Sequence, residues 1–236
     1  MRIALVDADT IAYRAGFAEL EVNMRRSIDD TMNYIMDNTM AEEARIYLGG
    51  TGNFRYDIYP QYKANRIGKD DPPHRQEAKQ YLVDHWDAFL VDGIEADDRV
   101  AIDNESLREC GENPIVCAID KDLLQLPGEH FNYDKGTWTT VSEWDGLKTF
   151  YQGLLIGDRA DHIFGVDGIG PKKSMYALQW CESEWELFET VRDMYDDDER
   201  LLVNGRCMWL LRSLPVEDNM WKFPEEVQRI EPEIEG

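Results

Sequence analysis

Long apolar runs are missing from this chain of 236 residues, although 43% of its residues are hydrophobic. A membrane-spanning helix needs about 20 consecutive apolar residues, so we expect no membrane span. The cationic and then apolar order of a signal peptide is also missing, because residues 2–6 run straight into Asp7. We therefore expect a cytoplasmic protein that forms one large domain, or a domain with a lobe.

Cysteine is scarce, and its spacing excludes the usual paired zinc motifs at Cys110, Cys117, Cys181 and Cys207. Reduced thiols in a cytoplasmic protein explain these residues best. Basic residues are scarce as well, since 25 of them stand against 48 acidic residues and give a formal net charge of −23. Such a charge argues against general binding to phosphate backbones. A nucleic-acid partner would therefore require local basic patches, or metal ions that neutralise part of the acid.

The apolar pattern predicts strands that alternate with helices in the first half of the chain. We expect strands over residues 2–6, 44–48, 88–91 and 114–119. We expect helices over residues 10–20, from Ser27, after the Pro72 and Pro73 pair, and from Glu95. This alternation favours an α/β core with a mainly parallel sheet. A hairpin turn at residues 134–136, a helical region from residue 143 and an acidic tail over residues 224–236 are expected to follow.

Carboxylates recur two or three residues apart at the ends of predicted elements. The groups are Asp7 with Asp9, Glu95 with Asp97 and Asp98, Asp120 with Asp122, and Asp158 with Asp161. Magnesium prefers oxygen ligands and keeps several waters, so a few carboxylates from different segments suffice to hold it. Without cations their convergence would be costly, because the acids repel one another. The alternative is that these acids are solvated surface residues or helix caps.

A glycine-rich stretch interrupts the helical second half at Gly165, Gly168 and Gly170. These glycines permit a tight turn between helices, and the backbone N–H groups at the next helix start can then face a phosphate. Lys172 and Lys173 add local positive charge there. The alternative is an ordinary glycine-rich turn between two helices.

Several blocks together resemble a known family, at residues 6–15, 54–55, 59–66, 95–98, 120–122 and 155–172. In order and spacing they are similar to the 5′-nucleases, which comprise flap endonucleases, phage 5′–3′ exonucleases and the nuclease domain of many bacterial DNA polymerases. The resemblance covers most of residues 1–180. It implies a PIN-like nuclease core over residues 1–142, including a short arch at about 62–92. It also implies a helical DNA-binding region at 143–223, with a helix–three-turn–helix motif at about 155–180.

The resemblance also implies roles for individual residues. The first metal site would use Asp7, Glu95 and Asp97, with Asp98 close by, and the second would use Asp120, Asp122, Asp158 and Asp161. Arg14 and Lys63 would approach the scissile phosphate and stabilise charge in the transition state. The DNA-binding residues would be Arg55, Tyr62, Arg66, Gly165, Gly168, Gly170, Lys172 and Lys173. A basic fringe on the arch would comprise Arg66, Lys69, Arg75 and Lys79; the alternative for Lys63 and Arg66 is a solvated loop.

Two positions depart from the family pattern. An aspartate usually follows the second strand, but Gly50 is the residue nearest that position here. The first metal site therefore lacks one expected ligand. His162 stands where an asparagine is common, and we expect it to cap a turn.

The sequence thus favours a two-metal 5′–3′ exonuclease or flap endonuclease that hydrolyses DNA, and the RNA of RNA–DNA hybrids, at 5′ ends. We expect two Mg²⁺ or Mn²⁺ ions, K⁺ at the helical hairpin, a monomer and no membrane partner. The expected setting is phage DNA replication in the host cytoplasm. One alternative is a structure-selective DNA-binding protein with a weakened active site. Another is a PIN-type ribonuclease acting on single-stranded RNA, although the helical hairpin favours duplex.

Overall fold

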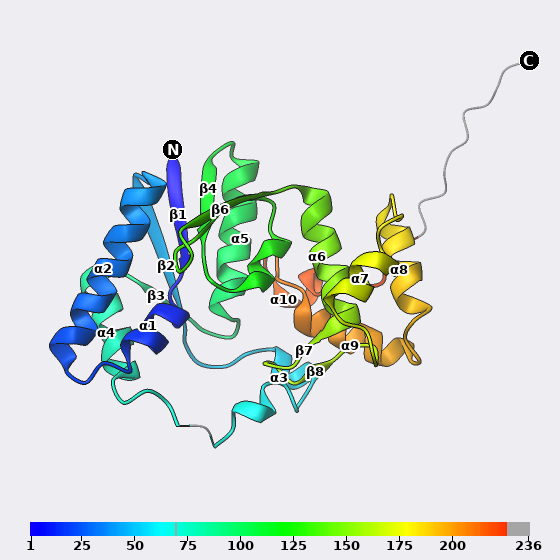
Figure 1. The fold of residues 1–236 in the computed structure, drawn as a ribbon, viewed down its shortest axis with the longest axis horizontal. Coiled ribbons are helices and arrows are strands. Elements are labelled where there is room, and N and C mark those ends of the chain that lie inside the picture. The colour runs from blue at the N-terminus through cyan, green and yellow to red at the C-terminus, as the bar shows by residue number, and fades with distance from the viewer. Residues whose placement is uncertain (69, 226–236) are drawn as a thin grey trace, which may run out of the picture.

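The computed structural model describes residues 1–68 and 70–225. Its centre is a six-stranded sheet in the order β3-β2-β1-β4-β5-β6 (Figure 1). The strands are β1 (Arg2–Asp7), β2 (Glu43–Gly49), β3 (Phe89–Val91), β4 (Asn113–Cys117), β5 (Gly128–Asn132) and β6 (Thr137–Val141). Neighbouring strands pair in parallel except for β5 and β6, which form the hairpin expected around residues 134–136. The prediction of an α/β core with a mainly parallel sheet is confirmed.

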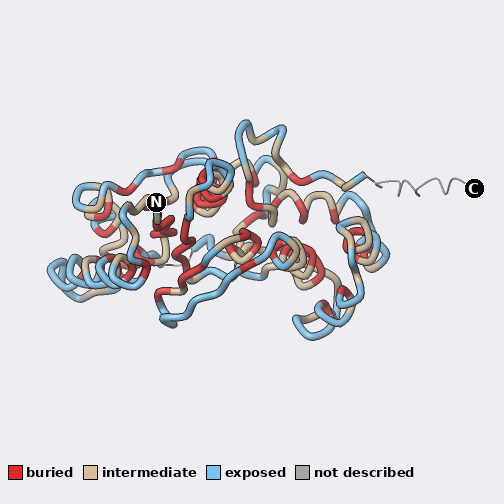
Figure 2. Tube along the Cα trace, turned by 90° about the horizontal axis from the view of Figure 1, so that it is seen from above, coloured by how far each residue is buried: buried red, intermediate tan, exposed pale blue. Residues whose placement is uncertain are grey.

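Both faces of β1 are apolar, and helices cover the sheet on both sides. Ala4 and Val6 belong to one buried cluster, whereas Ile3 and Leu5 belong to another, because successive side chains of a strand point to opposite faces. The first face is covered by α1 (Asp9–Ala15), α2 (Glu21–Thr39) and α4 (Arg75–Trp86). The second is covered by α5 (Ala96–Glu109). Figure 2 shows the buried segments between these layers and the exposed segments around them.

Helices of the second half form a third apolar cluster beside the sheet (Figure 1). They are α6 (Glu143–Ile156), α7 (Pro171–Ala177), α8 (Glu184–Arg192) and α9 (Asp198–Met208), followed by the short α10 (Val216–Asn219). The side chains of Ser142, Ser183 and Asp197 accept hydrogen bonds from the first turns of α6, α8 and α9. Such caps satisfy N–H groups that have no partner inside the helix. Phe150 and Trp221 lie in the buried interior of this cluster.

Short elements connect these parts. They are α3 (Arg55–Ile58), the 3-10 helices η1 (Ala64–Arg66) and η2 (Lys121–Gln125), and the antiparallel pair β7 (Gly157–Asp158) and β8 (Ile163–Phe164). The β7–β8 pair and the glycine-rich turn lie between α6 and α7. The helix–three-turn–helix motif therefore stays a prediction for this part of the chain.

Two helix boundaries differ from those expected. The helix predicted to begin at Ser27 begins at Glu21, because the buried stripe that includes Ile28 and Met32 extends back to Met24. Ser27 is thus an interior helix residue, not a cap. The helix predicted over residues 10–20 ends at Ala15. Gly16 follows the helix, and glycine is required there because a Cβ would lie 2.9 Å from Pro72 Cβ and 3.0 Å from the Arg75 backbone.

The segment at residues 62–92, expected to form an arch, is partly core. Ala78 and Leu82 of α4 are fully buried, and β3 pairs with β2. Lys69 of the expected basic fringe and residues 226–236 of the expected acidic tail lie outside the described residues. Among the residues described, no helix combines the length and apolar character that crossing a membrane requires.

Candidate active site

The strand order reverses between β1 and β4, and carboxylates gather there. β2 and β3 lie on one side of β1, whereas β4 and β5 lie on the other. Open parallel sheets bind ligands at the carboxyl ends of the strands beside such a reversal. Asp7 is the last residue of β1, and Asp120 follows β4 and caps η2 by accepting the Asp122 N–H at 2.9 Å. Glu95 is the N-cap residue of α5, so this helix begins beside them.

The carboxylates of the expected first metal group lie close enough together to raise one another's pKa. Burial, followed by the charge of Asp9, raises the pKa of Asp7 to about 7, and Asp120 and Glu95 add to the increase. Burial and the charges of Asp7, Asp120 and Glu95 also raise the pKa of Asp97. Carboxylates affect one another in this way only where they are close and poorly solvated. Asp7, Glu95 and Asp97 therefore share one site with Asp120.

The expected second group adjoins the first. Burial raises the pKa of Asp122 to about 7, and the charges of Asp120, Asp158 and Asp161 contribute further. Asp158 lies in β7 and accepts the Ala160 N–H at 2.7 Å. The charge of Asp120 contributes to the raised pKa of both Asp7 and Asp122, so the two groups of carboxylates adjoin each other.

Basic side chains from the start of the segment expected to form the arch neutralise part of the negative charge of these carboxylates. Lys63 forms an ion pair with Glu95 and lies 3.6 Å from Asp161, and Arg66 Nη2 donates to Asp161 Oδ1 at 2.5 Å. Within residues 1–68 and 70–225, no three His, Cys, Asp or Glu side chains are arranged as a ready-made metal site. The donor chemistry nevertheless fits a hard divalent cation, since carboxylate oxygens predominate.

The prediction that Arg55 binds DNA is wrong. Its side chain is 1% exposed and donates to Asp98 at 2.6 and 2.8 Å, and to the carbonyl oxygens of Cys207 and Trp209. Asp98 lies next to Glu95 of the first group, as expected, but its carboxylate is paired with Arg55, which argues against the predicted role as a metal ligand. Its fully buried carboxylate also accepts the Leu211 and Glu95 N–H groups. This pair joins α3, α5 and the segment after α9.

Tyr62 was also expected on the DNA-binding surface, and that prediction is wrong. The residue is 3% exposed, and its hydroxyl lies 2.9 Å from Glu95 Oε2 and 2.8 Å from Asp161 Oδ2. Burial and these two charges raise the pKa of Tyr62. Tyr62 therefore positions carboxylates from the two groups.

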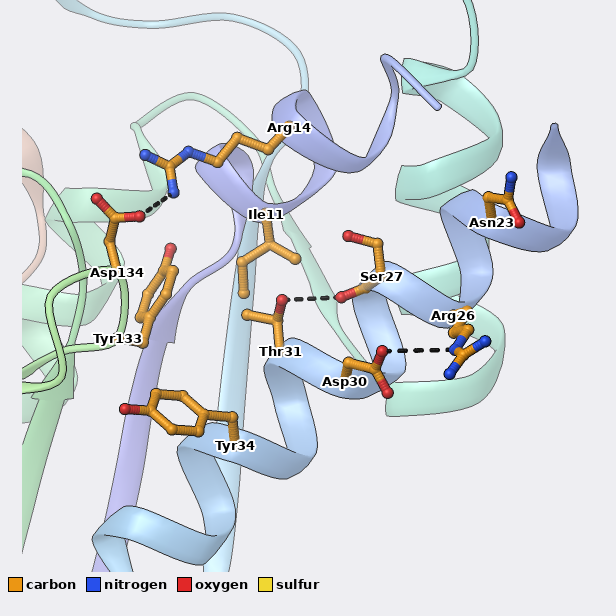
Figure 3. A pocket seen from close by; sticks show the side chains of 10 residues that line it. All are labelled: Ile11, Arg14, Asn23, Arg26, Ser27, Asp30, Thr31, Tyr34, Tyr133 and Asp134. Atoms are coloured by element: carbon orange, nitrogen blue, oxygen red, sulfur yellow. Dashed lines mark hydrogen bonds and ion pairs between the residues drawn. The ribbon is translucent and has the colours of Figure 1, made fainter. Parts of the chain in front are cut away.

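Arg14 lies at the edge of a cavity of about 610 Å³ between α1, α2 and the β5–β6 turn. Figure 3 shows its guanidinium directed at Asp134, and the two groups are 2.6 Å apart. Tyr133 lies beside this pair and donates from its hydroxyl to the Asp7 carbonyl at 3.2 Å. Arg14 is thus near the end of β1, and its catalytic role stays a prediction.

The glycine-rich turn has different requirements at its three glycines. Gly168 has φ +74°, which favours glycine. A Cβ at Gly165 would lie 2.5 Å from the Gly157 nitrogen and the Leu155 carbonyl oxygen, so close approach requires glycine there. Gly170 has open space around its Cα and an extended backbone. Lys172 and Lys173 are exposed beside the turn, and Lys173 donates to the Gly168 carbonyl at 2.9 Å. Their contact with DNA stays a prediction.

Asp9 was expected with Asp7 among the carboxylates that could hold magnesium, but the family resemblance gave it no place in either metal site; the structure places it beside the first site. Asp9 lines a cavity of about 460 Å³ that Lys63, Lys79 and Glu95 also line. Lys79 Nζ lies 3.1 Å from Asp9 Oδ1. The signal was the spacing of Asp9 two residues beyond Asp7, immediately after a buried strand. His162 has φ +63°, in agreement with a residue at a turn.

Comparison with known proteins agrees with this geometry. DNA polymerase I of Chloroflexus aurantiacus is 29% identical over 80% of this chain, which spans 23% of that polymerase. Flap endonuclease Xni of Shewanella piezotolerans is 28% identical over 69% of this chain and 68% of its own length. The bacteriophage T5 D15 flap endonuclease, solved with DNA and metal ions, superposes with a TM-score of 0.70 at 17% identity.

That structural likeness covers 86% of this chain and 87% of the phage protein, and it supports the PIN-like fold. Over residues 2–149 the sequence matches the family described as 5′-3′ exonuclease, N-terminal resolvase-like domain. This match covers more than half of the chain and contains the carboxylates from Asp7 to Asp122. The chain belongs to this 5′–3′ exonuclease family.

Proposed function

We propose that the protein is a metal-dependent 5′–3′ exonuclease or flap endonuclease that hydrolyses phosphodiester bonds in DNA. The observation that carries the proposal is the acidic site at the strand reversal, where Asp120 acts on Asp7 and Asp97 on one side and Asp122 on the other. An acidic site of this kind in a protein that acts on phosphates requires cations. Family membership and the DNA and metal ions in the phage relative support the same function.

Asp7, Glu95 and Asp97 would hold one divalent ion, and a second would be held by Asp120, Asp122, Asp158 and Asp161. Mg²⁺ suits these oxygen donors, and Mn²⁺ is an alternative. Such ions, when bound, supply water activation and stabilise the leaving oxygen of an in-line displacement.

The basic side chains at the site would change partners when substrate binds. Lys63 and Arg66 now neutralise Glu95 and Asp161. Neutralisation of these acids by cations would leave both side chains able to contact a phosphate, with Arg14 approaching from α1. Charge-assisted hydrogen bonds of this kind stabilise the negative charge that develops during phosphoryl transfer.

The region after residue 143 would hold duplex DNA beside the site, through Lys172, Lys173 and the turn at Gly165, Gly168 and Gly170. A K⁺ ion on carbonyls of this turn is part of the proposal. We propose that the protein acts as a monomer, that the RNA strand of RNA–DNA hybrids is a second substrate, and that DNA replication, in a phage or its host, is the setting. The polymerase relative supports the replication setting.

Cleavage of end-labelled substrates tests the function. Duplex, 5′-flap and hybrid substrates are incubated with Mg²⁺ or Mn²⁺ and wild type, Asp122→Ala or Asp37→Ala, the last of which removes an exposed acid from α2. We expect cleavage from 5′ ends by wild type and Asp37→Ala, and a loss of at least about a hundredfold in Asp122→Ala. Undiminished cleavage by Asp122→Ala would contradict the assigned site.

A structure-selective DNA-binding protein with a weakened active site is the second candidate. The ion pair between Lys63 and Glu95, and the absence of a carboxylate at Gly50, favour it. Tight binding to forked DNA without cleavage by wild type in either metal would support this candidate. Cleavage of single-stranded RNA in preference to duplex DNA would instead support a PIN-type ribonuclease.

A further inference from the structure

Asp9 lies across the carboxyl ends of β1 and β2, although it is numbered as the first residue of α1. Its backbone N–H donates to Asp7 Oδ1 at 3.1 Å, and its Oδ2 accepts the Gly49 N–H at 3.0 Å. The N-cap position of α1 is Ala8, which makes no side-chain cap hydrogen bond. Asp9 therefore links two strand ends, through its backbone N–H to Asp7 and through its carboxylate to Gly49, and its side chain does not cap the helix.

The other oxygen of Asp9, Oδ1, has the Lys79 ammonium as its partner. Oδ1 is shielded from solvent and accepts no hydrogen bond from the described residues. It faces the Lys79 ammonium at 3.1 Å, and Lys79 also donates to the Gly49 carbonyl at 2.6 Å. A carboxylate oxygen that is shielded from solvent, lies beside other acids and is neutralised only by an ammonium is suited to a cation.

Gly49 and Gly50, at the end of β2, leave no free space for side chains of their own. A Cβ at Gly49 would lie 2.8 Å from Asp9 Oδ2, and a Cβ at Gly50 would lie 2.4 Å from Asp92 Oδ1 and 2.9 Å from the Val91 carbonyl oxygen. Asp92 is occupied as the acceptor of the Thr51 N–H and hydroxyl. Asp9 fills the space beside Gly49 with its own carboxylate.

We infer that Asp9 is a ligand of the first divalent cation, and that Lys79 is the counter-ion which the cation displaces. The inference rests on the proposed function, because it places Asp9 in the site assigned to Asp7, Glu95 and Asp97. Lys63, which directly precedes η1, and Lys79, which lies in α4, then have matching roles. Each occupies a carboxylate of the first site, and cation binding frees each for a phosphate.

Manganese binding to the DNA-free protein tests the inference without any measurement of cleavage. The free Mn²⁺ signal in electron paramagnetic resonance gives the number of bound ions and their Kd for wild type, Asp7→Asn, Asp9→Asn and Asp57→Asn. Asparagine at residue 9 can still accept the Gly49 N–H, so the fold is preserved, and circular dichroism checks this. Asp57 is an exposed acid on α3, and its variant makes the same change in net charge.

We expect Asp9→Asn to weaken the ion that Asp7→Asn also weakens, by at least about tenfold, the loss typical of even an outer partner of a metal site. Asp57→Asn should bind as wild type, and Lys79→Met should bind this ion more tightly. Wild-type Mn²⁺ binding by Asp9→Asn, or weaker binding by Lys79→Met, would overturn the inference.

Failure of this inference and failure of the proposed function give different results. If wild type binds Mn²⁺ through Asp9 but cleaves no DNA, the inference holds and the proposed function fails. If wild type cleaves DNA and Asp9→Asn leaves the Mn²⁺ isotherm unchanged, only the inference fails.

Discussion

Replacement of Asp98 by alanine removes the carboxylate partner of a guanidinium that is almost fully buried. Arg55 donates to both oxygens of Asp98, and Asp98 also accepts from the Leu211 and Glu95 backbone. In the variant the buried positive charge of Arg55 no longer has the Asp98 carboxylate to neutralise it. Removing one partner of a buried ion pair lowers the free energy of unfolding by about 3–5 kcal/mol. The net contribution of the intact pair to stability is smaller. A domain of ordinary stability, about 5–15 kcal/mol, would lose a large fraction of its free energy of unfolding.

Urea unfolding followed by circular dichroism measures this loss. With a slope of about 2–3 kcal/mol per molar urea, the midpoint should fall by about 1–2 M. The control is Asp30→Ala, which breaks the exposed Arg26–Asp30 pair on α2 and should cost no more than about 0.5 kcal/mol. The double variant Arg55→Met/Asp98→Leu should recover part of the loss, because it leaves no unpaired buried charge.

The same variants test whether Asp98 has a structural role or binds metal. If the structural account is right, folded Asp98→Asn binds as many Mn²⁺ ions as wild type. A midpoint shift in Asp98→Ala as small as that in Asp30→Ala would refute the reasoning. Loss of one bound Mn²⁺ from a normally folded Asp98→Asn would restore Asp98 to the metal site.

Three further outcomes are expected. Gly205→Ala should lower the free energy of unfolding by about 1–3 kcal/mol, since its Cβ would lie 2.0 Å from the Trp221 ring; unchanged thermal unfolding would contradict this. Burial lowers the pKa of His130, so the unfolded chain takes up its proton first as the pH falls. Stability should therefore decline below about pH 6.5, by an amount that His130→Gln removes; equal pH slopes in the two proteins would count against it. Mn²⁺ added after chelation should raise the thermal midpoint of wild type more than that of Asp7→Asn, and an equal rise would argue against a metal ligand at Asp7.

Local sequence was sufficient to predict the buried strands and the helix start that form the acidic edge of the sheet. The apolar run before Asp7 and the run before Asp120 predict buried strands, and parallel strands bring their carboxyl ends to one edge. Glu95 was expected at a helix start, and it is the N-cap of α5. These few features predict the acidic edge without knowledge of any contact.

Burial of charge was not predictable from local sequence. Arg55 and Asp98 are 43 residues apart, so nothing beside either residue shows that they neutralise each other. Tyr62 similarly depends on Glu95 and Asp161, which come from distant segments. The resemblance places these residues near the site, but only tertiary structure distinguishes a side chain that contacts substrate from one that supports its neighbours.

The crowding at Gly50 restricts which side chains this position can carry. A side chain there would collide with the turn at Val91 and Asp92, so a carboxylate cannot be added by a single substitution without moving that turn. A change at Asp92 would have to come first, and it would remove both hydrogen bonds to Thr51. A carboxylate at residue 50 would thus cost the hydrogen bonds that now hold this turn together.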